Sequence, residues 1–387
     1  MQIDVWVHPW DISLEMVDNV LNDIVGFLNV DNITVFANYI NGIRVNGVFL
    51  FENRAQAMRF ISGQLFFKPD ETLYRATRLK PYFVEGATFF DLKYAIMKAN
   101  SYGLKTMVHV NFLNYAVSNE DYLNIDSDGE VVKYGGHWMS IHNSNVQRYL
   151  IALANNLALL DFVDFIEIGE YWYPISPVLK GRMSCFSKFA QTDAKDRGLD
   201  LMKAIPVIRR AAERLNIIKD TEYIEYSILF KPSHFAILKR FYNVIRKEMD
   251  EILAFRCDVV YDILSSIADV VRSCGAKLSL LTPPPSIAPL LGVDYKILSE
   301  VADYIRPIVY YGILFSSLRS LVSELKEAKK RSKSPVIPVI AITSAIDLKD
   351  LAKIIKKITR MGFQRISIYG YGFLGSEKLK VISEMLK

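Results

Sequence analysis

The sequence is poor in the residues that build disulfide frameworks and metal sites. Only three cysteines occur among 387 residues, at Cys185, Cys257 and Cys274, together with five histidines. An odd, widely spaced set of cysteines is typical of a reducing compartment and argues against a disulfide framework. No CxxC or HExxH pattern occurs, so neither a structural zinc site nor a zincin site is expected. We therefore expect no metal and no cofactor.

Long apolar runs and blocks of one charge are also missing. No apolar stretch reaches the length of a membrane span, and the chain begins like a strand rather than a signal peptide, so we expect a cytoplasmic protein. The 47 basic and 42 acidic residues are interspersed, apart from a short run at 326–333. That run is typical of the solvated end of a helix. Neither nucleic acid nor a membrane is expected as a partner.

What the sequence does contain is a regular alternation of apolar strand segments with helical segments. Eight segments separated mostly by helices predict an α/β fold, the (β/α)8 TIM barrel. No glycine-rich phosphate fingerprint follows the first strand, which argues against a doubly wound nucleotide-binding fold. The expected strands are 2–7, 33–37, 105–110, 163–168, 277–281, 304–310, 336–342 and 365–370.

The length beyond that of a typical barrel lies in a few connections. We expect one domain spanning 1–387, with long insertions in the loops after strands 2, 3 and 4. Segments 39–87 and 175–257 are the insertions or extended loops, and they are expected to form one wall of a cleft. A mostly helical region is expected from about 181 to 274, with helices at 234–254 and 258–274 and with Arg256 and Asp258 as a cap and surface pair between them.

The fourth strand ends in the most informative stretch of the chain. Residues 163–174 begin as a buried strand and end in two acids, Glu167 and Glu170, and three aromatic residues at 171–173. Carboxylates supply acid, base or nucleophile, and flat rings match the C–H faces of sugars. Glu170 lies last and is our first choice for catalysis, while Glu167 is a second acid or an orienting partner. The alternative is a buried strand whose acids pair with neighbouring bases.

A second carboxylate is needed for glycoside hydrolysis. Asp294, in the loop after strand five, is the leading candidate, although it can equally cap the helix that follows it. Asp11, after strand one, comes next. A carboxylate gap of about 5 Å implies a retaining enzyme and about 6.5–9.5 Å an inverting one. The aromatic-rich mouth leaves little room for a distant carboxylate, which favours retention.

The carboxyl ends of barrel strands converge on one mouth, so residues there are candidates for substrate binding. Aromatic, amide and imidazole groups dominate, which favours a neutral polyol over a phosphate substrate. A histidine at a strand end is structural as often as functional. The candidates are His8, Trp10, Asp11, Asn38, His109, Asn111, Tyr171, Trp172, Tyr310, Tyr311, Tyr369 and Tyr371.

Several of these stretches together resemble a known group. The run 164–174 is similar to its fourth-strand motif Asp-Gly-Ile-x-x-x-Asp/Glu-Tyr-x-Tyr-Pro. Upstream, 145–150 is similar to its helix start, and downstream, 292–295 and 302–310 are similar to its later strands. The group is that of the glycoside-hydrolase-like (β/α)8 proteins, and the resemblance covers roughly residues 80–315. It implies a hydrolase acting on glycosyl bonds. Two positions depart from the pattern: Gly169 replaces an Asp of many relatives, and Val146 replaces a proline.

Three functions therefore compete. The first is a glycoside hydrolase acting on an oligosaccharide or glycoside by carboxylate acid/base catalysis. The second is a non-catalytic carbohydrate-binding barrel, which the Gly169 departure supports. The third is a sugar isomerase or aldolase. An aldolase needs a buried lysine at a strand end, and Lys105 and Lys277 both begin strands instead.

Overall fold

Parallel strands form the framework of the molecule. The computed structural model describes residues 2–9, 11–12, 17–28, 30–39, 63–86, 90–115, 119–133, 137–217, 232–341 and 346–386. The strands are almost wholly buried, as expected for apolar segments covered on both faces. In chain order the strands of the central sheet are β1 (Gln2–Val7), β2 (Asn32–Phe36), β3 (Lys105–Asn111), β6 (Phe165–Gly169), β7 (Lys277–Thr282), β8 (Tyr304–Pro307), β9 (Val339–Ala341) and β10 (Arg365–Tyr369).

The eight strands close into a barrel. Their order is β8-β7-β6-β3-β2-β1-β10-β9, and every pair in this sheet is parallel. Backbone bonds across the remaining seam join β8 to the β9 side, from Ile337 N to Ile305 O at 3.0 Å and from Val309 N to Val339 O at 2.9 Å. The predicted (β/α)8 fold is confirmed.

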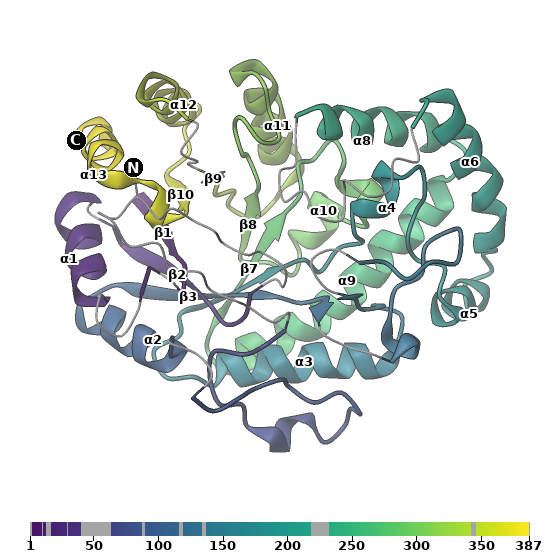
Figure 1. Ribbon diagram of the computed structural model, residues 1–387, viewed down its shortest axis with the longest axis horizontal. Helices are drawn as coiled ribbons and strands as arrows, with labels where there is room; N and C mark the ends of the chain where they lie inside the picture. The colour runs from purple at the N-terminus through teal and green to yellow at the C-terminus, as the bar shows by residue number, and fades with distance from the viewer. Residues whose placement is uncertain are drawn as a thin grey trace.

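Helices surround the strands, as Figure 1 shows. One helix follows each strand, because a parallel pair needs a crossover connection. Strands β1 and β10 are neighbours, so the two ends of the chain lie close together. The helices that follow the eight strands in turn are α1 (Val17–Leu28), α2 (Leu92–Ser101), α3 (Ser144–Ala158), α9 (Asp250–Ser273), α10 (Tyr295–Leu298), α11 (Leu318–Arg331), α12 (Leu348–Arg360) and α13 (Gly375–Leu386).

Extra elements occupy the connections after strands β2, β3 and β6. A 3-10 helix, Glu71–Tyr74, follows β2, and the antiparallel pair β4 (Asn114–Tyr115) and β5 (His137–Trp138) follows β3. Between β6 and α9 lie α4 (Ser176–Leu179), α5 (Lys188–Asp196), α6 (Ala204–Arg214) and α8 (Pro232–Ile245). The division into one barrel domain with insertions at 39–87 and 175–257 stays a prediction.

The helices before β7 differ from the expectation in one respect. The break between them lies between α8 and α9, at 246–249, and not at 255–257. Phe255, Arg256 and Cys257 are all buried and continue the inner face of α9. Arg256 is therefore not a surface cap residue, and that prediction was wrong.

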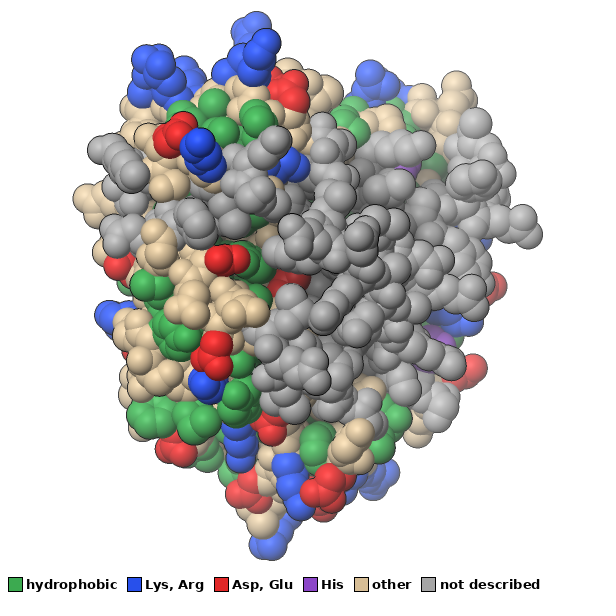
Figure 2. Space-filling view, turned by 60° about the vertical axis from the view of Figure 1, so that its left-hand side comes forward, with side chains coloured by type: hydrophobic (Ala, Val, Ile, Leu, Met, Phe, Trp, Pro, Cys, Tyr) green, Lys and Arg blue, Asp and Glu red, His purple; other side chains and the backbone are tan. Residues whose placement is uncertain are grey.

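The surface carries charges of both signs. In the face shown in Figure 2, basic and acidic side chains are interspersed over the described residues. Over the described part of the chain, no helix is both long enough and apolar enough to cross a membrane.

Candidate functional site

A single arginine occupies the centre of the barrel. Arg306 of β8 is fully buried, and its guanidinium contacts side chains from five other strands. Its Nη1 lies 2.6 Å from Glu167 Oε2 on β6, and its Nη2 lies 3.8 Å from Asp4 Oδ2 on β1. Its remaining hydrogen-bond partners come from β2, β3 and β10, namely Thr34, Met107 and Ser367. Arg306 thus ties the strands together across the axis.

Both carboxylate oxygens of Glu167 are bonded within this interior network. Besides Arg306, its Oε1 lies 3.0 Å from His109 Nδ1, and Ser279 Oγ lies 3.5 Å from its Oε2. His109 Nε2 in turn lies 3.1 Å from Asn111 Oδ1. Both His109 and Glu167 are buried, at 2% and 0% exposure. Glu167 and His109 were predicted for catalysis and substrate binding, and the structure places them in a paired core instead of leaving them open.

The His109 ring also explains why position 169 is a glycine. A Cβ added to Gly169 would lie 2.6 Å from His109 Cε1 and 3.1 Å from its Nε2. Real Cβ atoms do not approach a ring so closely, so any larger residue requires His109 to move. The volume that a side chain at position 169 would occupy is filled from the neighbouring strand β3.

Glu170 has the opposite surroundings. It is the residue after β6, and its backbone φ of 52° lies in the left-handed region, which non-glycine residues rarely adopt. Its Oε2 is buried and has no hydrogen-bond partner among the described residues. Burial raises the pKa of the Glu170 carboxyl from 4.5 to about 8. Such a strained, unpaired acid is typical of a functional group.

Aromatic rings lie beside Glu170. Tyr369 and Tyr39 are hydrogen-bonded to each other, and both are close enough to Glu170 for its charge to raise their pKa. The Tyr369 ring lies 5.5 Å from that of Tyr310 and 5.0 Å from that of His8, measured between centroids. Strands β1, β8 and β10 thus bring predicted residues together at one end of the barrel.

The remaining polar candidates at this end are bonded to one another. Asn38 and Asn111 form a reciprocal pair, Asn38 Nδ2 to Asn111 O at 3.0 Å and Asn111 N to Asn38 Oδ1 at 2.9 Å. The His8 backbone N–H donates to Asp11 Oδ2 at 2.9 Å. Asp11 also contributes to raising the pKa of Tyr369. Tyr369 therefore lies near two carboxylates, Glu170 and Asp11.

Other predicted aromatic residues do not form an exposed platform. Tyr171 and Trp172 are 1% and 6% exposed and pack edge-to-face at 5.1 Å. The Tyr371 hydroxyl donates to Asp23 Oδ2 of the outer helix α1 at 2.6 Å. Tyr311 lies in the turn after β8, where it bridges to Phe315. Trp10 lies outside the described residues.

Asp294 serves as a helix cap. Its Oδ1 accepts the backbone N–H groups of Lys296 at 2.8 Å and Ile297 at 3.2 Å, at the start of α10. Its charge also raises the pKa of Cys257 on the outer helix α9, so the carboxylate lies on the α9 side. The hydrogen bonds of Asp294 are therefore those of a helix cap, the alternative role considered for it.

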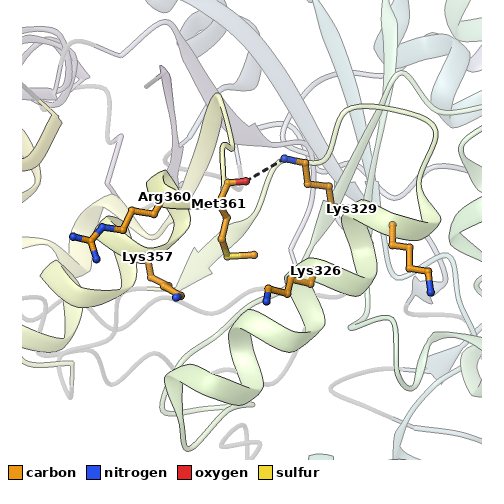
Figure 3. Close-up of a pocket in the computed structure, with 6 residues that line it drawn as sticks. Lys326, Lys329, Lys357, Arg360 and Met361 are labelled. Atoms are coloured by element: carbon orange, nitrogen blue, oxygen red, sulfur yellow. Dashed lines mark hydrogen bonds between the residues drawn. The ribbon is translucent and has the colours of Figure 1, made fainter.

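A groove outside the barrel is lined by residues of a different kind from those around Glu170. It has a cavity volume of about 440 Å³ and lies between α11 and α12, lined by Lys326, Lys329, Lys330, Lys357, Arg360 and Met361. Figure 3 shows Lys326 and Lys357 extending toward the space between the helices, with Lys329 bonded to the Met361 carbonyl at 3.1 Å. Four of these cations belong to the last turns of their helices, where they complement the helix dipole. The groove has no aromatic ring and no acid.

Comparisons with solved structures agree with this architecture. The glycoside hydrolase domain of PgaB (BpsB) from Bordetella bronchiseptica aligns with a TM-score of 0.65 and 9% identity, over 100% of this chain and 98% of that one. This chain and that domain therefore share the (β/α)8 fold. The C-terminal domain of a chitinase-like protein from Desulfitobacterium hafniense aligns at 0.50 and 9% identity, over 100% and 99% of the two chains. No protein-family model and no curated protein matches the sequence.

Sequence reasoning did not select two groups that the structure makes prominent. Arg306 is one, although a charged residue inside an apolar strand was a signal that could have found it. The other is a buried cluster around His142 and Cys185, which lie 43 positions apart. No local motif joins those two residues.

Proposed function

We propose that the protein is a glycoside hydrolase and that Glu170 is its general acid. The observation that carries the proposal is the Glu170 carboxyl itself. It follows the fourth barrel strand, has a buried oxygen without a partner among the residues that the structure describes, and has its pKa raised to about 8 by burial. An acid with that pKa holds its proton at neutral pH and can give it to a departing glycosidic oxygen.

The surroundings suit a neutral sugar. The rings of Tyr369, Tyr310 and His8 lie within 5.5 Å of one another in succession, and their flat faces can pack on the C–H faces of a pyranose. The hydroxyl groups of Tyr39 and Tyr369 can exchange hydrogen bonds with sugar hydroxyls. Within the described part of the chain, burial alone accounts for the raised pKa of Glu170, with no contribution from a lysine or arginine.

Asp11 is the second carboxylate in this proposal. Tyr369 is close to both Asp11 and Glu170, whereas Asp294 is engaged as a cap and Glu167 is bound to Arg306. The crowded aromatic mouth favours retention, in which Asp11 would form the covalent intermediate. The anomeric configuration of the first product, followed by nuclear magnetic resonance, tests this point.

A non-catalytic carbohydrate-binding barrel is the second candidate. The observation in its favour is that two of the three acids predicted for catalysis are already occupied by other partners. Such a protein would bind oligosaccharides through the same rings without cleaving them.

The test is incubation with a panel of oligosaccharides of different sugars and linkages. We expect cleavage of at least one by the wild type, a loss of about 10²- to 10⁴-fold in turnover for Glu170→Gln, and no loss for Glu213→Gln. Glu213 is an exposed acid of α6 and serves as the matched control. Equal turnover in wild type and Glu170→Gln would remove Glu170 from the reaction. Binding without cleavage would favour the second candidate.

A further inference from the structure

A cysteine, a histidine and an aspartate form a connected chain far from the barrel axis. His142, just before α3, has Nδ1 2.8 Å from Asp193 Oδ2 on α5 and Nε2 3.0 Å from Cys185 Sγ. The hydroxyl group of Tyr173, in the loop after β6, lies 2.8 Å from the same Nε2. Nucleophile, base and an acid that orients the base are arranged as in activated-nucleophile sites.

The number of protons in this cluster points to a thiolate. In the neutral form, the imidazole would donate from Nδ1 to Asp193 and keep one lone pair on Nε2. Two hydroxyl or thiol groups compete for that lone pair. If the Cys185 proton moves to Nε2, the imidazolium and the Tyr173 hydroxyl can both donate to the sulfur, and every group has a partner.

The electrostatic surroundings favour the same state. The Arg256 guanidinium lies 3.9 Å from the centre of the Tyr173 ring and bonds to Ser184 O at 2.8 Å, next to Cys185. Burial alone would raise the pKa of the Cys185 thiol, but His142 and Arg256 outweigh it and lower that pKa. Burial likewise opposes the charged form of His142, yet Cys185 and Asp193 raise its pKa to about 9.

The backbone at Cys185 is in a conformation that a side chain disfavours. Its φ is 87°, and its N–H is held by Asn124 Oδ1 at 2.9 Å. Strained backbone held in place by surrounding contacts is a feature of functional positions. The backbone conformation, the hydrogen bonds and the neighbouring charges thus all favour an activated Cys185.

We propose that Cys185 is a modification site, an activated thiolate that hydrogen peroxide oxidises to a sulfenic acid. The residue is only 3% exposed, so a water-sized oxidant fits the site better than a bulky electrophile. The sulfur attacks one peroxide oxygen, an S–O bond forms and the O–O bond breaks. Sulfur loses two electrons, the second oxygen leaves as hydroxide, and the proton from His142 Nε2 converts it to water.

The chain carries its own controls. Cys257 is buried like Cys185, but burial raises the pKa of its thiol to about 12. Cys274 is partly buried, and its Sγ lies 3.5 Å from the side-chain oxygen of Asn155. The three thiols can be compared in one sample.

The experiment is a timed exposure of the intact protein to hydrogen peroxide. The oxidant is removed, the protein is unfolded in the presence of a diketone that traps sulfenic acids, and labelling of each cysteine peptide is measured by mass spectrometry. We expect Cys185 to react at least about tenfold faster than Cys257 and Cys274, because an ordinary thiol is only a few per cent thiolate at pH 7. Reaction of Cys185 no faster than Cys257 would overturn the proposal.

Two variants separate activation from simple exposure. His142→Gln removes the imidazolium and should slow Cys185 oxidation to the rate of Cys257. Tyr173→Phe removes one donor and should slow it less, while circular dichroism checks that both variants are folded. If His142→Gln does not fold, Tyr173→Phe carries the test. A folded variant of either kind that oxidises at the wild-type rate counts against the proposal.

Discussion

The barrel interior around Glu167 and the rim around Glu170 place two acids three residues apart in opposite surroundings. Glu167 is bonded to Arg306, His109 and Ser279, and all of its acceptor capacity is directed at the core. Glu170 has a buried oxygen to which no described residue hydrogen-bonds, and its backbone is strained at φ 52°. An acid that is fully paired stabilises the fold, whereas an acid with an unpaired buried oxygen is available for a proton transfer.

The largest effect on stability should come from removing the Glu167 charge that pairs with Arg306 inside the barrel. Glu167→Gln leaves the buried Arg306 charge without its closest carboxylate, so the free energy of unfolding should fall by about 3–5 kcal/mol. Glu170→Gln should not lower the free energy of unfolding at pH 7 and should raise it, because the wild-type acid must take up a proton on folding whereas glutamine is neutral in both states. Urea denaturation of both variants measures the contrast, and equal losses would contradict it.

The pH dependence of stability should distinguish the two acids next. Folding raises the Glu170 pKa from 4.5 to about 8. Between those values the native state holds a proton that the unfolded state has lost, so this group's contribution to stability falls as the pH rises. The slope is at most about 1.4 kcal/mol per pH unit. Melting curves from pH 5 to 8 should decline less steeply for Glu170→Gln than for the wild type.

The proposed partner of Glu170 should matter for turnover more than for stability. Asn at position 11 can still accept the His8 N–H, so Asp11→Asn should fold normally. It should lower turnover by about 10²-fold or more if Asp11 is the second carboxylate. Steady-state kinetics with the best substrate of the panel measures this effect. An unchanged kcat would show that Asp11 is not the second carboxylate.

The smallest effect should come from the rim tyrosines. Tyr369→Phe removes the hydrogen bond with Tyr39, which is worth about 0.5–1.5 kcal/mol of stability. The ring remains, so binding of an oligosaccharide should weaken only several-fold. Calorimetric titration measures the binding, and a complete loss would mean that the hydroxyl, and not the ring, holds the sugar.

The sequence predicted the barrel because its signal is local. Apolar runs and the helices between them could be read one segment at a time, and the position of Glu170 at a strand end followed from the same segments. Partners that lie far apart in the chain could not be read in that way. Arg306 meets Glu167 across the barrel, and Cys185 meets His142 only because α3 and the loop after β6 fold together.

Local ambiguity accounts for the other differences. Asp294 before a helix is compatible with a cap and with an acid facing the mouth, and only the direction of its side chain separates the two. The gap between α8 and α9 was misplaced because Arg256 resembles a break in an apolar pattern. In the structure its charge is satisfied by the carbonyl groups of Ser184 and Leu290.

The close approach of His109 to Gly169 has a consequence for how this sequence can change. An aspartate at position 169, as in the relatives that the sequence resembles, cannot be accommodated while the imidazole stays in place. A smaller residue at position 109 would make the space but would leave Glu167 without one of its partners. The two positions are therefore epistatic: each single substitution should be harmful, and the double variant should be better than the sum of the two. An acid at position 169 becomes reachable in directed evolution only through paired changes.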